Sequence, residues 1–423
     1  MLLTMINIFK KSAFLSISLK NSSQVLVRVF IGIINIKLIA LLLGPTGLAL
    51  VSQLQNFLQL SVNLAGAGIN SGVVKHVSKL DKSSNHKQAI INTSFTIVIV
   101  VSVVVSGIIA FFNDFVSIYL FDSRDYSKVI FFAAIYIIST SLFNLVLSII
   151  NGLQKLRIFV VLNIIYFTSG FLIFIISIYF LGLNGALWAV LFQSIIAFSL
   201  GILKLRQLGF KVKLFFYRQI AVKLSKFSLM ALISGLITPF VVIIIRKLII
   251  QELSVHEAGI WDGVLKISTS YIGIATLPFS YYFLPTFSRL TDAQEIRDEV
   301  KRTILILVPL LLIVGFGIYA SRILIIQLML SREFSEASLI INWQIMGDGF
   351  KVLCWLLGLL LIAKEKVLAF IATELLSGII FISTAYLLIP RLGIEGSTIA
   401  YFLENTLSFS VLCGVFAYYW SKK

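Results

Sequence analysis

The sequence predicts an all-α polytopic membrane protein of about twelve transmembrane helices in two six-helix bundles. Its composition is 59% hydrophobic and 13% charged, whereas soluble domains are roughly a quarter charged. Apolar runs of 18 residues or more recur along the chain, and such runs span a hydrocarbon core as helices. Because the runs are continuous rather than alternating, they exclude the strands of a membrane barrel.

The apolar runs place each expected span. They lie at 22–43, 48–73, 88–112, 127–150, 155–180, 184–203, 225–247, 258–287, 300–320, 337–362, 367–389 and 395–420. Two of them, 48–73 and 258–287, are long and partly polar, which predicts tilting, kinking or a wet face. The glycines of LAGAGINSG (64–72) favour a close helix approach or an irregular segment there.

Basic loop residues orient the spans. Most of them fall on the side that carries both termini, and they are Lys10, Lys11, Lys20, Lys75, Lys79, Lys82, Lys87, Lys155, Arg157, Lys204, Arg206, Lys211, Lys213, Arg218, Lys223, Lys226, Arg289, Arg297, Lys301, Arg302, Lys364, Lys366, Lys422 and Lys423. The other side holds Arg124, Lys128, Arg246, Lys247, Arg322, Arg332 and Arg391. The positive-inside rule then predicts cytoplasmic termini. Since the net charge of +17 lies in short loops between spans, it argues against nucleic-acid binding.

Similar segments recur about 211 residues apart. LGLNG at 181–185 returns as LGIEG at 392–396, and Lys155 returns as Lys366. An offset of six helices predicts halves of parallel topology, related by a pseudo-two-fold axis along the membrane normal. We therefore expect an N-terminal bundle at 1–203, a basic cytoplasmic linker at 204–224 and a C-terminal bundle at 225–423.

Ionisable residues inside the expected spans form the candidate site. A charge at the bilayer centre costs about 2.5–3.5 kcal/mol on insertion scales, so such residues usually face the bundle interior. They are Arg28, Lys37, Asp262, Lys266, Asp348, Lys351, Glu374 and Glu404. The alternatives are that Asp262–Lys266 and Asp348–Lys351 neutralise themselves within one helix, and that Arg28 and Lys37 snorkel to the interfaces.

The second span adds uncharged polar residues at helical spacing. Ser52, Gln55, Gln59 and Asn63 form one stripe, which in lipid would be unfavourable. Hydrogen bonding between helices is one interpretation, and the wall of a hydrophilic cavity is the other.

Cysteine and histidine give no sign of a metal site or another cofactor. Cys354 and Cys413 lie in apolar runs as small packing residues. His76, His86 and His256 lie in loops without metal-ligand spacing.

Three stretches carry a family resemblance. The segment LLLGPTGLALVSQLQNFLQLSVNLAGAGINSGVVKHVSK (41–79), the G-x-W-x-G-V segment at 259–264 with YYFLPTFSRL (281–290), and GDGFKVL (347–353) resemble the bacterial lipid-linked oligosaccharide flippases of the MOP exporter superfamily, the O-antigen and enterobacterial common antigen translocases. The resemblance implies two six-helix bundles around a central cavity. It also implies export of an undecaprenyl-diphosphate-linked oligosaccharide to the periplasmic leaflet of the inner membrane, coupled to H⁺ or Na⁺. The partners it implies are membrane lipids, a polysaccharide polymerase and a chain-length regulator.

The residues and the resemblance join in one hypothesis. Arg28, Lys37, Lys266 and Lys351 are expected to bind the diphosphate in a low-dielectric cavity. Gln55, Gln59 and Asn63 are expected to contact the glycan. The carboxylates expected to take up the coupling ion are Asp262, Asp348, Glu374 and Glu404.

Three other classes of protein compete with this hypothesis. A multidrug antiporter of the same superfamily would favour an acidic, aromatic cavity, whereas the set here is balanced in charge. A membrane glycan polymerase would need a sizeable extramembrane loop and a nucleophile with its base, and the 204–226 loop has no acid, His or Cys. A scaffold protein would leave the charges inside the spans without a purpose.

Overall fold

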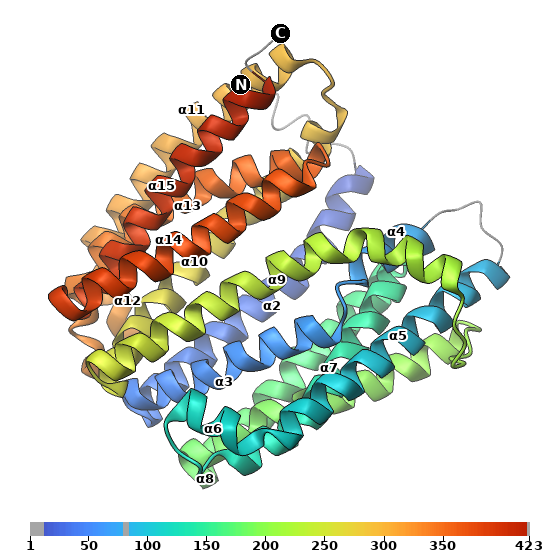
Figure 1. Ribbon diagram of the computed structural model, residues 1–423, viewed down its shortest axis with the longest axis horizontal. Helices are drawn as coiled ribbons and strands as arrows, with labels where there is room; N and C mark the ends of the chain where they lie inside the picture. Colours follow the sequence, from blue (N-terminus) through green and yellow to red (C-terminus); the bar gives the residue numbers. More distant parts are fainter. Residues whose placement is uncertain (1–11, 79–83, 421–423) are drawn as a thin grey trace. The chain divides into compact units, whose positions relative to one another are not determined.

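The computed structural model describes residues 12–78 and 84–420, and almost all of them lie in α-helices (Figure 1). The first half of the chain forms α2 (Ser12–Leu42), α3 (Gly44–Ala65), α4 (Asn70–Val77), α5 (Ser84–Phe111), α6 (Asn113–Phe121), α7 (Ser127–Gly152) and α8 (Leu156–Gln207). The second half forms α9 (Arg218–Glu252), α10 (Val255–Arg289), α11 (Ala293–Ala320), α12 (Arg322–Met329), the 3₁₀ turn η1 (Arg332–Phe334), α13 (Ala337–Ala363), α14 (Val367–Leu392) and α15 (Glu395–Trp420). The described ranges contain no β-strand, and the predicted all-helical fold is confirmed.

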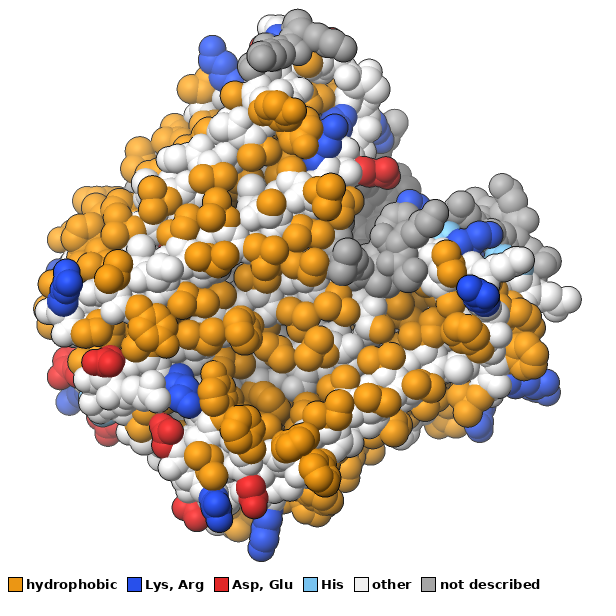
Figure 2. Space-filling view, viewed as in Figure 1, with side chains coloured by type: hydrophobic (Ala, Val, Ile, Leu, Met, Phe, Trp, Pro, Cys, Tyr) orange, Lys and Arg blue, Asp and Glu red, His pale blue; other side chains and the backbone are white. Residues whose placement is uncertain are grey.

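Several described helices can cross a membrane. By length and apolar composition there are eight, or nine if α3 and α4, bent by 49° at their junction, form one span. The bend lies at the predicted irregular segment, where Ala67 and Gly68 have positive φ. Hydrophobic side chains cover the face seen in Figure 2, and charged side chains lie mostly toward helix ends. The protein is a multi-pass membrane protein.

Helix α8 accounts for two of the predicted spans. A straight helix of its 52 residues would extend about 78 Å at 1.5 Å per residue, far more than a hydrocarbon core of about 30 Å. Gly182 interrupts it with φ 55° and ψ −134°, between the spans predicted at 155–180 and 184–203. With α8 divided there and α3–α4 joined, a helix lies at the place of each predicted span.

The predicted repeat appears in the backbone itself. Gln154 and Glu365, 211 residues apart, both have positive φ, at 57° and 54°. Gly182 and Gly393, also 211 apart, have φ of 55° and 64°. The short helices α6 and α12, which the sequence did not predict, follow the third span of their respective halves.

The chain divides into two compact units that differ from the predicted bundles. One unit holds the residues up to Asn35 together with Phe57–Leu236, and the other holds Ile36–Asn56 together with the residues from Ile237 onward. The end of α2 and the start of α3 (residues 36–56, below called the α2–α3 hairpin) thus group with the second half of the chain.

The predicted linker is largely structured. Lys204 and Arg206 are still in α8, and only residues 208–217 lie between α8 and α9. The backbone N–H groups of Lys211 and Lys213 donate to Gln88 Oε1 at 3.2 Å and Asn92 Oδ1 at 3.1 Å on α5. These bonds explain why the stretch groups with the first unit.

Each unit has its own apolar core. In the first, Val73, Phe95, Phe143 and Val146 pack together from α4, α5 and α7. In the second, the hairpin residue Ala49 packs with Ile245, Trp261, Ala385 and Tyr401. Of the basic residues assigned to the cytoplasmic side, Lys10, Lys11, Lys79, Lys82, Lys422 and Lys423 lie outside the described residues.

Candidate functional site

A buried ion pair joins α9 to α10 in the second unit. Arg246 donates from Nε to Asp262 Oδ2 at 2.7 Å and from Nη2 to Asp262 Oδ1 at 2.6 Å. Its remaining terminal nitrogen, Nη1, donates to Gln53 Oε1 of the α2–α3 hairpin at 2.5 Å. Arg246 and Asp262 are each only 1% exposed. An ion pair with further hydrogen bonds is the form in which buried charges are tolerated.

This pair changes the expected surroundings of two residues. Arg246 ends the span predicted at 225–247 and is expected among the basic residues of the far side, whereas α9 continues through it to Glu252 and its side chain is buried. Asp262 is expected to pair with Lys266 on its own helix or to remain available, and its ion-pair partner is Arg246 instead. The apolar sequence on both sides of Arg246, VVIII before it and LII shortly after it, indicates that the helix continues past residue 247.

Lys266 binds a neutral partner. Its ammonium donates to Gln55 Oε1 of the hairpin at 3.2 Å, and the side chain is half-buried. Among the described residues no carboxylate oxygen lies within ion-pair distance of Lys266. The recorded hydrogen-bond partner of the Lys266 ammonium is therefore a neutral amide and not a carboxylate.

Lys37 has a different environment from the one predicted. Its ammonium donates to the backbone oxygens of Gln327 at 2.6 Å and Leu330 at 2.5 Å. These carbonyls lie at the end of α12, where a helix has unpaired oxygens and partial negative charge. In this structure Lys37 caps α12 and joins the hairpin to it, rather than facing a cavity as a free cation.

Asp348 on α13 is satisfied by neutral donors. Its Oδ1 accepts from Ser268 Oγ at 2.8 Å, from Tyr401 Oη at 2.7 Å and from Gln344 Nε2 at 3.2 Å. Tyr271 Oη donates to its Oδ2. Four donors on three helices therefore surround this carboxylate. No pattern in the sequence indicates Tyr401, Gln344 or Ser268 as partners of Asp348.

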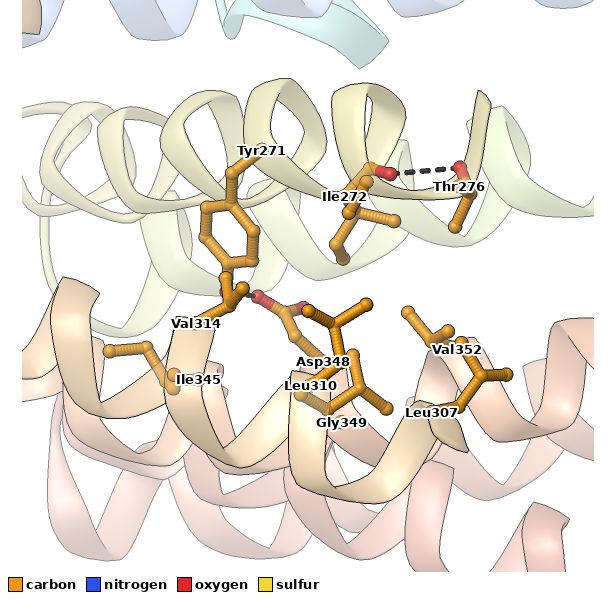
Figure 3. A pocket seen from close by; sticks show the side chains of 13 residues that line it. Tyr271, Ile272, Thr276, Leu307, Leu310, Val314, Ile345, Asp348, Gly349 and Val352 are labelled. Carbon is orange, nitrogen blue, oxygen red and sulfur yellow. Dashed lines mark hydrogen bonds between the residues drawn. The ribbon is translucent and has the colours of Figure 1, made fainter. Parts of the chain in front are cut away.

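A small cavity adjoins this carboxylate. It encloses about 40 Å³ between α10, α11 and α13, enough space for a water molecule. Figure 3 shows the Tyr271 ring pointing from α10 toward Asp348, with Leu307, Leu310 and Val314 among the apolar walls. The carboxylate of Asp348 is thus the acidic group that lines this water-sized space.

Lys351 and the two glutamates lie near this cluster. The Lys351 ammonium is 5.2 Å from the centre of the Tyr401 ring, which indicates a cation–π contact. Glu404 is buried and accepts from Ser377 Oγ at 2.5 Å and Ser408 Oγ at 3.1 Å. Glu374 is half-buried and within electrostatic range of Lys351. Like Lys266, Lys351 has no carboxylate within ion-pair distance in the described part of the chain.

Three predicted site residues belong to the first unit. Arg28 is exposed, and its guanidinium carbon lies 5.8 Å from the centre of the Phe167 ring. Gln59 donates to Asn63 Oδ1 at 3.2 Å, and Asn63 Nδ2 donates to the Gly235 carbonyl at 2.5 Å. The polar stripe of the second span therefore makes hydrogen bonds between helices at Asn63. Of the stripe residues in the predicted site, Gln55 alone belongs to the second unit.

One group of possible metal ligands was missed. His256 and Glu257 at the start of α10 and Glu336 before α13 place three ligand-type atoms within 4.8 Å of one another, a spacing that suits one shared cation. Burial raises the pKa of the Glu257 carboxyl, and the nearby Glu336 carboxylate raises this pKa further. The expectation of no metal-ligand cluster followed from sequence spacing alone, and Glu336 is distant from the other two in sequence.

Comparison with known proteins gives one consistent result. A family model described as "Polysaccharide biosynthesis protein" matches residues 38–339. The Lipid III flippases of Escherichia coli (strain K12) and Shigella flexneri are each 31% identical over 407 residues, which cover 94% of this chain and 97% of theirs.

Solved structures agree in fold. An inward-facing multidrug resistance MATE family transporter of the MOP superfamily matches with a TM-score of 0.71 and 13% identity, over 94% of each chain. The Lipid II flippase MurJ in its inward closed conformation matches with a TM-score of 0.66 and 13% identity, over 95% of this chain and 87% of that one. The chain belongs to the family of polysaccharide biosynthesis proteins and has the MOP-superfamily transporter fold.

Proposed function

We propose that this protein is a flippase that moves a lipid-linked oligosaccharide from the cytoplasmic to the periplasmic leaflet of the bacterial inner membrane. The observation that carries the proposal is the 31% identity to the Lipid III flippases over 94% of the chain. The substrate would be an oligosaccharide joined through a diphosphate to a polyprenyl tail, of the undecaprenyl class. Its headgroup crosses an apolar bilayer slowly by itself because the headgroup must leave water.

The site chemistry suits a diphosphate. Lys266 and Lys351 have neutral partners, an amide and an aromatic ring, so an incoming anion has no ion pair to displace. Charge-assisted hydrogen bonds to such cations contribute about 1.5–3 kcal/mol each. Arg28 of the first unit is a further exposed cation, and Gln55, Gln59 and Asn63 supply polar groups for sugars.

Ion coupling forms part of the proposal. The four carboxylates Asp262, Asp348, Glu374 and Glu404 differ in availability, because Asp262 is held by Arg246. Asp348, beside the water-sized cavity, is the carboxylate best placed to take up H⁺ or Na⁺. The proposal includes cytoplasmic termini, and a polysaccharide polymerase with its chain-length regulator as the proteins that use the flipped product.

The test is transport by the purified protein in proteoliposomes. We expect it to move a fluorescent undecaprenyl-diphosphate oligosaccharide between leaflets, measured by quenching with a membrane-impermeant reductant. Lys266→Gln should slow transport roughly 10- to 100-fold, since one charge-assisted contact is lost. Arg322→Met, which removes a charge on α12 outside the site, is the matched control.

A multidrug antiporter is the second candidate, and the similarity in fold to the MATE transporter motivates it. The same vesicles should then expel organic cations and fail to flip the lipid. Cation efflux without lipid transport would replace the flippase proposal.

A further inference from the structure

Asp262 and Lys266 have opposite charges and lie at a spacing at which side chains on a helix can form an ion pair. They are four residues apart on α10, the spacing at which side chains on one helix face are neighbours. Without another partner, the carboxylate of Asp262 would pair with the Lys266 ammonium in this weakly polar setting. Such a pair would compensate the positive charge of Lys266 and leave its ammonium less available to another anion.

Arg246 prevents this pairing by occupying the carboxylate. It contacts both oxygens of Asp262, at 2.7 and 2.6 Å, from the neighbouring helix α9. Bidentate arginine–carboxylate pairs are stronger and more directional than a single lysine contact. Gln53 holds the third side of the guanidinium, and the Trp261 ring centre lies 5.9 Å from its central carbon. The arginine is therefore held in position by groups on two other helices, α3 and α10.

The α2–α3 hairpin provides separate hydrogen-bond partners for Arg246 and for Lys266. Gln53 and Gln55 lie on the same stretch of α3, and Gln55 accepts a hydrogen bond from Lys266 at 3.2 Å. One stretch of α3 thus supplies an amide to the arginine and another amide to the lysine. The lysine is oriented by a neutral group while the carboxylate is oriented by a cation.

We propose that Arg246 is a positioning residue that keeps Lys266 available to an anionic headgroup by holding Asp262 away from it. This inference rests on the proposed function, because it assigns Lys266 to the diphosphate of the substrate. Arg246 itself is only 1% exposed, and each of its three guanidinium nitrogens donates a hydrogen bond within the protein, so we assign it no contact with the substrate. The alternative is that Arg246 only stabilises the fold. The two roles differ in whether replacing Arg246 weakens substrate binding only when Lys266 is present.

The experiment measures binding of undecaprenyl diphosphate to the purified full-length protein in detergent, together with its melting temperature. Arg246→Met should weaken binding about 10- to 100-fold, because Asp262 is then free to pair with Lys266. Arg246→Met/Asp262→Asn should recover binding to within about threefold of wild type, since no carboxylate remains to capture the lysine. Arg246→Lys keeps the charge but lacks the planar guanidinium that contacts both carboxylate oxygens, so it should give an intermediate loss. This variant takes the place of Arg246→Met if Arg246→Met does not fold.

The decisive comparison is made in a Lys266→Gln background. There, Arg246→Met should change the melting temperature but not the binding constant, because the group through which it acts is absent. A purely structural arginine would weaken binding equally in both backgrounds, and that result would overturn the inference. Wild-type binding by Lys266→Gln, or by a folded Arg246→Met, would also overturn it.

The same data separate this inference from the proposed function. If wild type binds and flips the lipid while Arg246→Met binds equally well, the inference fails and the flippase stands. If wild type neither binds undecaprenyl diphosphate nor flips a lipid-linked oligosaccharide, both are overturned. Arg322→Met, the control for loss of a positive charge, should bind like wild type.

Discussion

At the scale of single residues, the buried carboxylates of Asp262 and Asp348 accept hydrogen bonds from side chains on other helices. Asp262 and Asp348 both had basic neighbours on their own helices, yet their hydrogen bonds come from Arg246, Tyr271 and Tyr401. A helix interior offers a long side chain few low-energy rotamers, so contacts from a facing helix can satisfy a carboxylate better. The result leaves Lys266 and Lys351 as cations beside neutral groups.

One glycine allows the close approach of the hairpin to α10. A Cβ atom added at Gly259 would lie 1.9 Å from the Pro45 carbonyl oxygen and 2.7 Å from its Cα. Because these are backbone atoms, they cannot rotate away as a flexible side chain would.

Gly259→Ala is therefore predicted to destabilise the second unit. Displacing the hairpin backbone should cost about 1–3 kcal/mol, as overpacking does elsewhere, and should lower the melting temperature in detergent. Gly273→Ala on the same helix has nothing within 4 Å and is the matched control. An equal melting temperature for the two variants would contradict the close approach.

At the scale of elements, the helix breaks repeat between the halves. Gly185 and Gly396 each begin a span next to the end of the preceding one. An added Cβ would meet the Ser177 carbonyl oxygen at 1.9 Å in the first case and the Leu388 carbonyl oxygen at 2.4 Å in the second. Positions 177 and 388 are again 211 residues apart. The helix break and the close packing that follows it therefore occur at equivalent positions in the two halves of the chain.

Gly182→Ala and Gly393→Ala should therefore have similar effects. Both glycines have φ near +60° with strongly negative ψ, a region that residues with a side chain avoid at a cost of about 1–3 kcal/mol. We expect each substitution to lower the melting temperature. Gly107→Ala and Gly414→Ala, which have open space and no positive φ, should change it little. A clear loss at one break and none at the other would mean that the two breaks are not equivalent.

At the scale of the whole molecule, the second unit depends on a segment from the start of the chain. The hairpin supplies Ala49 to its core, Gln53 to Arg246 and Lys37 to the end of α12. Without the hairpin, a buried guanidinium would lose a hydrogen-bond acceptor, which costs about 1–3 kcal/mol or more for a charged group.

A chain divided between Leu214 and Phe215, both exposed in the stretch between α8 and α9, tests this dependence. Residues 215–423 expressed alone should be degraded or aggregate, and co-expression with residues 1–214 should restore a stable complex, measured by membrane yield and co-purification. Residues 1–214 carrying Gln53→Ala and Gln55→Ala should restore it less well. Stable recovery of 215–423 by itself would contradict the prediction.

The sequence by itself determined the helical membrane fold, the place of each span and the repeat, because these depend on local hydropathy and on glycine in particular backbone conformations. Lys266 and Asp348 could be identified as candidate site residues because a charged residue within an apolar run can be recognised from the sequence alone. Which charges pair was decided only by tertiary structure. Arg246 meets Asp262 across two helices, the hairpin joins the second unit, and Lys37 reaches carbonyls nearly 300 residues away. Those contacts depend on how helices face one another, and no local pattern in the sequence carries that information.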